Sequence, residues 1–181
     1  MALECFLIWK YRLEAGNSPL CNFGRLHPHY SHSRNRSTGI RGGLLPEDQR
    51  SQIVSSMPPL PQHGNPMDSD WMTLSWTQLE AFNPKGLISA PEVPGVYKLI
   101  AGVDQLLYVG ESANLKKRLA THLQRTWGDS EIRFAFCSLP QAEHASQRLE
   151  IENDLIAGYY STTKRPPTFQ FGVKVPSSPE H

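Results

Sequence analysis

The stretch GVYKLIAGVDQLLYVG, residues 95–110, decides the fold of this chain. β-Branched and aromatic side chains concentrate in its two runs, 96–100 and 106–109, and this composition is typical of strands. The connection at 102–105 is short and begins with glycine, so an antiparallel hairpin is the most economical arrangement. We therefore expect residues 95–110 to form two adjacent strands of a small sheet.

The residues that follow predict a helix, a third strand and a longer helix. Leucines recur at every fourth residue within 113–125, which gives that segment one apolar stripe, and Ser112 precedes it as a helix cap. Residues 132–136 alternate apolar with polar or small side chains, and 141–160 form the longest helical segment. This order predicts an α+β domain in which helices flank a three-stranded antiparallel sheet.

The residues on either side of this domain differ from it in composition. Apolar residues occupy 12 of the 50 positions in 21–70 but 46 of the 111 positions in 71–181. We expect 1–70 to be a disordered tail, because it cannot bury enough apolar area to offset its conformational entropy. A short helix and a proline-spaced connector are expected at 71–93, the folded domain at 94–174, and a disordered end at 175–181. The tail has an alternative explanation, a misassigned start, because methionines suitable for initiation stand at 57, 67 and 72.

Charge and cysteine content exclude several classes of protein. The 18 basic and 17 acidic side chains give a net charge of +1, which argues against a histone-like or ribosomal-type protein. The three cysteines are widely spaced, so they provide neither a disulfide framework nor a C-x-x-C metal site. No apolar run approaches the length of a membrane span. We expect a cytoplasmic protein without a membrane partner.

Two tripeptides and two helical motifs carry a family resemblance. Ten residues separate the tripeptide Gly95-Val96-Tyr97 from the tripeptide Tyr108-Val109-Gly110. Arg118 and His122 then lie four residues apart on the next helix, and Glu152-Asn153-Asp154-Leu155-Ile156 lies on the last one. In type, order and spacing these motifs resemble those of the GIY-YIG nuclease superfamily. The resemblance covers about 94–171 and favours a small standalone or restriction-type member of that superfamily.

The resemblance implies a metal-dependent DNA endonuclease that hydrolyses phosphodiester bonds. It assigns catalytic positions to Tyr97, Tyr108, Arg118, His122 and Glu152, with Tyr97 positioning or activating water. Glu152 would hold one Mg²⁺ (or Mn²⁺), since this ion keeps several waters and needs few protein carboxylates. Arg118 would stabilise the phosphate, for which its planar guanidinium is suited.

Other polar residues are expected to contact nucleic acid or to be structural. Lys98, Lys116, Lys117 and Gln170 are the expected nucleic-acid contacts. Gln170 occupies the place where many members of the family have a Tyr-Asn pair after a proline. At 111 this chain has glutamate, whereas excision-repair incision subunits have lysine.

The helix at 141–160 adds two further expectations. Glu150 is two residues from Glu152, about 200° around the helix, so it cannot share its face. His144 and Arg148 are expected at the protein surface.

Two alternatives to a nuclease stay open. One is a catalytically silent nucleic-acid-binding module of the same fold. The other is an interaction domain in which the tyrosines, Arg118 and Glu152 are structural. The position of Glu152 distinguishes the interaction domain from the other two: a nuclease needs Glu152 on the same face as Tyr97 and Tyr108, whereas an interaction domain does not. Substrate preference, pathway and oligomeric state do not follow from the sequence.

Overall fold

The computed structural model describes residues 1–19, 43, 45–49, 55–128 and 131–172. The helices are α1 (Ala2–Ala15), α2 (Leu115–His122) and α3 (Ala145–Thr163), and the strands are β1 (Glu80–Ala81), β2 (Gly95–Ala101), β3 (Gln105–Ser112) and β4 (Ile132–Ser138). Short 3₁₀ turns occur at Glu47–Gln49, Trp71–Thr73 and Gly86–Ser89. Among the described residues, no helix is long and apolar enough to span a membrane.

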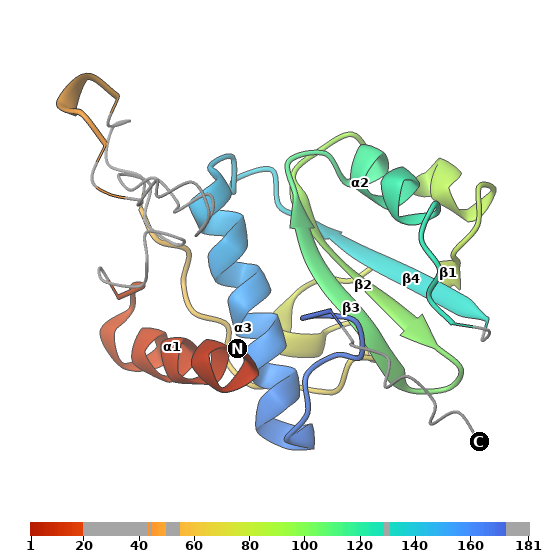
Figure 1. Cartoon of the computed structure of the whole chain (residues 1–181), viewed down its shortest axis with the longest axis horizontal. Coiled ribbons are helices and arrows are strands. Elements are labelled where there is room, and N and C mark those ends of the chain that lie inside the picture. The colour runs from red at the N-terminus through yellow and green to blue at the C-terminus, as the bar shows by residue number, and fades with distance from the viewer. Residues whose placement is uncertain (20–42, 44, 50–54, 129–130, 173–181) are drawn as a thin grey trace, which may run out of the picture.

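The four strands form one antiparallel sheet in the order β1-β4-β2-β3. Strand β2 is central, because it pairs along its whole length with both β3 and β4. Figure 1 shows α2 at one end of the sheet and α3 along it, with α1 lying outside α3. The expected hairpin at 95–110 is present, with Gly95 opposite Ser112 and Ala101 opposite Gln105.

The two faces of the sheet bury two separate cores. Val96 and Ile100 of β2 join the core that includes α3, part of α1 and the tryptophans at 71 and 76. Tyr97 and Leu99, their neighbours in sequence, join the core beneath α2. Because side chains alternate along a strand, β2 supplies both cores. Its residues are all buried.

The sheet has four strands, so the expectation of three is wrong. The added strand is β1, two residues that pair with β4 through Glu80 and Phe134. In place of the short helix expected within 71–93, the structure has the 3₁₀ turn at Trp71–Thr73, then β1, and then the turn at Gly86–Ser89. Backbone bonds to β4 explain the extended conformation, because the amide of Thr77 donates to Phe136 and that of Phe82 to Ile132.

The expected disorder of residues 1–70 is not confirmed. Residues Ala2–Ala15 form α1, which packs on α3 and buries four of its side chains, namely Cys5, Ile8, Trp9 and Arg12. The indole of Trp9 donates to the carbonyl of Leu60 at 2.8 Å, which ties α1 to the segment before β1. Within the expected tail, residues 20–42, 44 and 50–54 lie outside the described residues, as does the expected disordered end at 175–181.

The boundaries of α2 and α3 follow from their caps. Asn114, not Ser112, caps α2, because its side chain accepts from the amide of Lys117 at 2.9 Å. His144 caps α3 in a reciprocal arrangement with Gln147. These caps satisfy amide groups that have no partner within the helix.

Candidate active site

The hairpin places the two motif tyrosines on one face of the sheet. Tyr97 lies in β2 and Tyr108 in β3, with ring centroids 6.1 Å apart and the rings stacked. A side chain at Gly110 would overlap the hydroxyl and ring of Tyr97. At Gly95 a side chain would collide with the carbonyl of Cys137 and with Leu115 of α2. The two motif glycines therefore make room for Tyr97 and for α2.

The hydroxyl of Tyr97 joins the sheet to α2. It lies 2.7 Å from Nε2 of His122 and accepts a hydrogen bond from Nε of Arg118 at 3.3 Å. Arg118 has no acceptor atom and donates to the phenol oxygen. The phenol hydrogen is therefore donated to Nε2 of His122, which acts as the acceptor. Among the described side chains, Nδ1 of His122 is the buried polar atom without a hydrogen-bond partner.

Burial keeps these groups electrically neutral at pH 7. Tyr97 is 0% exposed, and burial together with the nearby Tyr108 raises its pKa far above the ordinary value. Burial and the charge of Glu152 also raise the pKa of Tyr108. The pKa of His122 falls to about 4, through burial and the charges of Arg118 and Arg125. Arg118 itself is exposed and charged.

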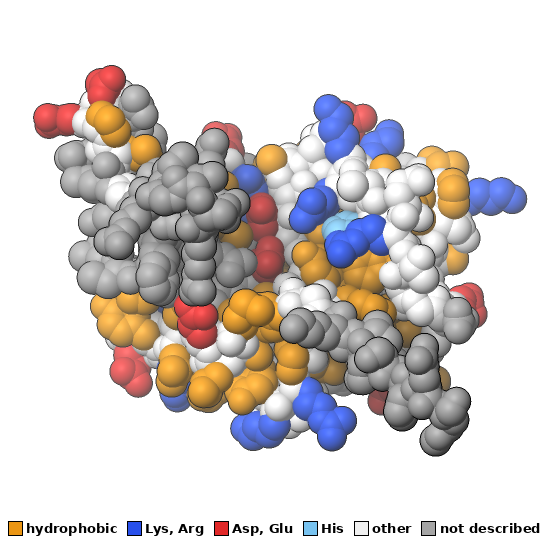
Figure 2. Space-filling view, in the orientation of Figure 1, with side chains coloured by type: hydrophobic (Ala, Val, Ile, Leu, Met, Phe, Trp, Pro, Cys, Tyr) orange, Lys and Arg blue, Asp and Glu red, His pale blue; other side chains and the backbone are white. Residues whose placement is uncertain are grey.

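Aromatic side chains surround this group. His122 lies 5.2 Å, centroid to centroid, from Trp127, which also contacts Tyr108 and Phe169 at 5.6 and 5.5 Å. The indole of Trp127 donates to the carbonyl of His122 at 2.9 Å and so fixes the end of α2. Figure 2 shows the cationic side chains gathered over α2 around a small area of histidine, beside hydrophobic surface.

Glu152 comes from α3 and lies near both tyrosines. Its Oε2 accepts from the backbone amide of Glu111, at the end of β3, at 3.0 Å. Glu111 directly follows Gly110, which pairs with Tyr97 across the hairpin, so this bond places the carboxylate beside the strands that carry both phenols. The negative charge of Glu152 contributes to the raised pKa of Tyr97 and of Tyr108. Tyr97, Tyr108, Arg118, His122 and Glu152 are thus brought together from four elements.

The side chains of the site fit a Mg²⁺ ion with few protein ligands better than a metal ion that is coordinated by protein alone. Among the described residues, no group of three or more His, Cys, Asp or Glu side chains is placed to hold a metal ion. Glu152 would supply one carboxylate, and Mg²⁺ generally needs few protein ligands because it keeps several of its waters. A structural zinc site would need four protein ligands.

Comparison with known proteins agrees with this geometry. A family model described as a UvrC-like GIY-YIG domain matches residues 93–160. These residues belong to the GIY-YIG nuclease superfamily. The match includes all five residues of the site.

Curated relatives share this part of the chain. UvrABC system protein C of Methylobacillus flagellatus is 32% identical over 84 residues, covering 43% of this chain and 14% of the relative. The protein of the same name from Aromatoleum aromaticum is 35% identical over 75 residues, with 39% and 12% covered. That of Rickettsia rickettsii is 42% identical over 62 residues, with 34% and 10% covered. The chain therefore matches only a small part of the length of these relatives.

The GIY-YIG domain has a partly buried ion pair at its second motif. Arg148 of α3 donates through Nε to Oε2 of Glu111 at 2.8 Å, and through Nη1 to the carbonyls of Ala142 and Glu143. The expectation that Arg148 lies at the surface is wrong, since the residue is only 5% exposed. His144 is half-buried, because its ring caps α3. Glu111 therefore forms an ion pair with Arg148, a structural role that was not predicted from the sequence.

Lys98, expected to contact nucleic acid, is buried in this structure. It is 1% exposed and lies on the sheet face opposite Tyr97, with Nζ 4.3 Å from the ring centroid of Trp76 and 5.5 Å from that of Trp71. Burial lowers its pKa to about 7. The alternation of β2 explains the error, because adjacent residues of a strand point to opposite faces.

The other expected contacts divide into one structural residue and two exposed lysines. The amide of Gln170 bonds to the backbone of Val109 twice, accepting from N–H and donating to C=O, each at 3.0 Å. Gln170 thus supports the edge of β3, and its expected role as a nucleic-acid contact is not supported. Lys116 and Lys117 are exposed on α2, and Lys116 lies 3.7 Å from the exposed Glu92.

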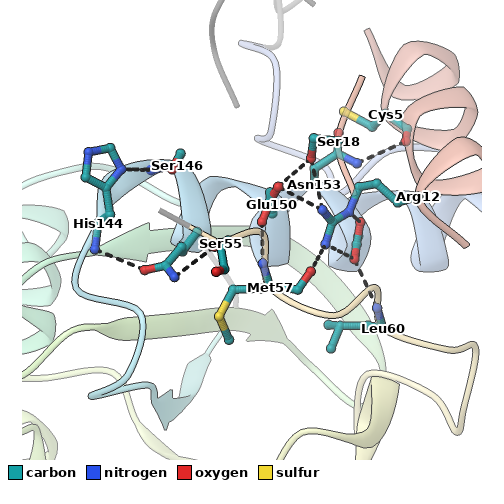
Figure 3. Close-up of polar contacts among 12 residues, drawn as sticks. Cys5, Arg12, Ser18, Ser55, Met57, Leu60, His144, Ser146, Glu150 and Asn153 are labelled. Carbon is teal, nitrogen blue, oxygen red and sulfur yellow. Dashed lines mark hydrogen bonds and ion pairs between the residues drawn. The ribbon is translucent and has the colours of Figure 1, made fainter. Parts of the chain in front are cut away.

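The opposite side of α3 carries a polar cluster that sequence reasoning missed. Arg12 of α1 is completely buried and contacts both Asp154, at 2.9 Å from Nε, and Glu150, at 3.0 Å from Nη1. Figure 3 shows its guanidinium between α1 and α3, with the backbone of 55–60 beside it. The same carboxylates accept the amides of Met57, at 2.7 Å, and Leu60, at 3.0 Å.

The geometry of α3 confirms that Glu150 and Glu152 lie on different faces. A signal for the cluster exists in the sequence. Arg12 has the helical spacing of the apolar residues Cys5, Ile8 and Trp9, which places a charge on the apolar face of that segment. Glu150 and Asp154 are four residues apart, so they share one helix face.

Proposed function

We propose that this chain is a metal-dependent endonuclease that hydrolyses phosphodiester bonds in DNA. The observation that carries the proposal is the convergence of Glu152, from α3, with the tyrosines of β2 and β3 and with Arg118 of α2. Such a reaction needs an activated water, a cation on the phosphate and help for the leaving oxygen. The residues of the site match these three needs.

Glu152 would hold the divalent ion, and the exposed guanidinium of Arg118 would bind the phosphate. When bound, Mg²⁺ supplies charge neutralisation on the phosphate and lowers the pKa of coordinated water. Arg118 is suited to the phosphate because its planar fork donates two parallel hydrogen bonds. Lys116 and Lys117 lie on the same short helix and would contact the DNA backbone on either side of the site.

Tyr97 and His122 would form a proton relay. The phenol is buried beneath Arg118, so it contacts the attacking water only when Arg118 moves toward the phosphate. A free tyrosinate is unfavourable here, because burial raises the pKa of Tyr97. The neutral ring of His122, 2.7 Å away, accepts the phenol proton as Tyr97 takes one from water. Tyr108, half-buried at the edge of the site, would hydrogen-bond the phosphate.

A plasmid-nicking assay tests the proposal. Wild-type protein is expected to relax supercoiled plasmid in Mg²⁺ and to lose that activity in EDTA. Glu152→Ala should reduce the rate at least about 100-fold, because the ion loses its protein ligand. Glu131→Ala, which removes an exposed carboxylate at the start of β4, is the matched control and should cleave like wild type. An inactive wild type, or a Glu152→Ala variant as fast as wild type, would refute the assignment.

A second candidate is a nucleic-acid-binding module without turnover. The complete burial of Tyr97 favours it, because a buried phenol does not contact substrate directly. This candidate predicts DNA binding that weakens steeply with salt, since cations on α2 would supply the affinity. Binding without any nicking in Mg²⁺ or Mn²⁺ would distinguish it from the endonuclease.

A further inference from the structure

Arg148 links three parts of the chain at the edge of the site. Its Nε donates to the carboxylate of Glu111 at 2.8 Å, and its Nη1 donates to the carbonyls of Ala142 and Glu143 at 2.8 and 2.6 Å. One guanidinium therefore joins the end of β3, the loop before α3 and α3 itself. The side chain of Arg148 is 6% exposed and that of Glu111 is 22% exposed, so the ion pair is partly buried.

Glu111 carries this link to the proposed metal ligand. Its side chain contacts Arg148, and its backbone amide donates to Oε2 of Glu152 at 3.0 Å. Arg148 and Glu152 are four residues apart on α3, so they lie one above the other on the same side of the helix. Glu111, at the end of β3, thus contacts both Arg148 and Glu152 of α3.

We propose that Arg148 and Glu111 are positioning residues that fix the carboxylate of Glu152 and thereby set the affinity of the site for a divalent cation. The inference rests on the proposed function, because it takes Glu152 as the metal ligand. The tyrosines stand on the sheet and Glu152 stands on a helix, so their separation depends on contacts between β3 and α3. A catalytic constellation needs its groups held to within about 0.5 Å.

The chemistry of the pair suits a positioning role. An ion pair that is largely withdrawn from water adds little net stability compared with an apolar pair of similar size, because its charges lose much of their hydration. Its geometry, however, is specific, because the rigid guanidinium donates to a carboxylate and to two carbonyls at fixed angles. Lysine keeps the charge but has no such fork. Groups that orient a metal ligand typically affect metal affinity or activity by about 10- to 100-fold.

The test measures Mn²⁺ binding as well as cleavage. Arg148→Lys and Glu111→Gln are compared with Arg133→Lys, which replaces an arginine of β4 that donates to the carbonyls of Gly102 and Val103. Electron paramagnetic resonance gives the Kd for Mn²⁺ without DNA. Plasmid nicking gives kcat, KM for DNA and the Mg²⁺ concentration at half-maximal rate, and circular dichroism gives Tm.

We expect the two site variants to bind Mn²⁺ about 10-fold or more weakly and to need correspondingly more Mg²⁺. Their KM for DNA should stay within twofold of wild type, because α2 is unchanged, and Arg133→Lys should resemble wild type throughout. A merely structural role would lower Tm while the folded protein kept its Mn²⁺ affinity, and that result overturns the inference. If Arg148→Lys does not fold, Glu111→Gln decides alone.

The inference and the proposed function fail in different ways. If wild type cleaves and Glu152→Ala does not, but Glu111→Gln keeps wild-type Mn²⁺ affinity, only the positioning role is refuted. If wild type neither cleaves nor binds Mn²⁺, the proposed function is refuted and the inference with it.

Discussion

The guanidinium of Arg12 and the carboxylate of Asp154 form a two-point contact between residues 142 positions apart in the sequence. Nε lies 2.9 Å from Oδ1 and Nη2 lies 3.2 Å from Oδ2. Both side chains are fully buried, so the contact holds the N-terminal helix on the outer side of α3. Helix α3 also carries Glu152, so the contact between Arg12 and Asp154 connects the N-terminal segment to the proposed site.

Arg12→Met should destabilise the folded chain strongly. The substitution leaves the charges of Glu150 and Asp154 buried without their cation, and breaking such a set typically costs about 3–5 kcal/mol. Urea denaturation followed by tryptophan fluorescence measures the free energy of unfolding. Lys10→Met, an exposed position on the same helix, is the control and should change stability by less than about 0.5 kcal/mol. Equal effects of the two substitutions would contradict a structural role for the cluster.

Stability should rise with pH above neutrality because of Lys98. Burial lowers its pKa to about 7 in the folded chain, from 10.5 when unfolded. Between these values the unfolded chain binds more protons, so raising the pH favours folding, by up to about 1.4 kcal/mol per pH unit. Below pH 7 both states are protonated and the contribution is constant. The contacts with Trp71 and Trp76 favour the cation and reduce the slope.

Lys98→Met isolates this effect. Urea denaturation of both proteins at pH 7, 8 and 9 should show the advantage of the variant shrinking as the pH rises, because the wild-type lysine loses its charge. A difference that stays constant over this range would show that Lys98 does not titrate in it.

His122 should make stability fall in mild acid. Burial is the main reason that its pKa drops to about 4, from 6.5 when unfolded. Between pH 6.5 and 4 the unfolded chain binds the extra proton, so stability is lost as the pH falls through this range. His122→Gln keeps an acceptor for Tyr97 but does not titrate. The stability difference between wild type and variant should therefore change between pH 6.5 and 5, and parallel curves would argue against a buried, neutral imidazole.

Gln170→Ala should reduce stability without weakening DNA binding. The substitution removes two hydrogen bonds to Val109, each worth about 1 kcal/mol. Fluorescence anisotropy with a labelled duplex should give a Kd within twofold of wild type, whereas Lys117→Ala should weaken binding and reduce its salt dependence. A large loss of DNA affinity in Gln170→Ala would restore the role expected from the sequence.

The central part of the fold was predictable because its signals are local. Two runs of strand-forming residues around a short turn define β2 and β3, and one stripe of leucines defines α2. Strand β1 was missed for the opposite reason. It has only two residues, and its conformation depends on β4, about fifty residues later in the chain.

The candidate site was predicted by motif, but its surroundings were not. Tyr97 was expected in the catalytic site and Lys98 in contact with nucleic acid, but adjacent residues of β2 point to opposite faces of the sheet, so the two side chains lie in separate cores. Arg148 was expected in solvent because charged residues usually are, yet Glu111 and two carbonyls satisfy it inside the protein. The place of Arg12 likewise depends on partners far along the chain, which local patterns do not reveal.

The cluster at Arg12 also determines which residues a fusion protein must include to carry this domain. The family match covers residues 93–160, which include Glu150 and Asp154. Both carboxylates, however, form ion pairs with Arg12, outside the match. They also accept the backbone amides of Met57 and Leu60, which lie outside it too. A fusion built from the matched segment alone would carry two uncompensated carboxylates on the helix that bears Glu152. The smallest portable unit therefore includes α1, which lies more than seventy residues upstream of the matched segment.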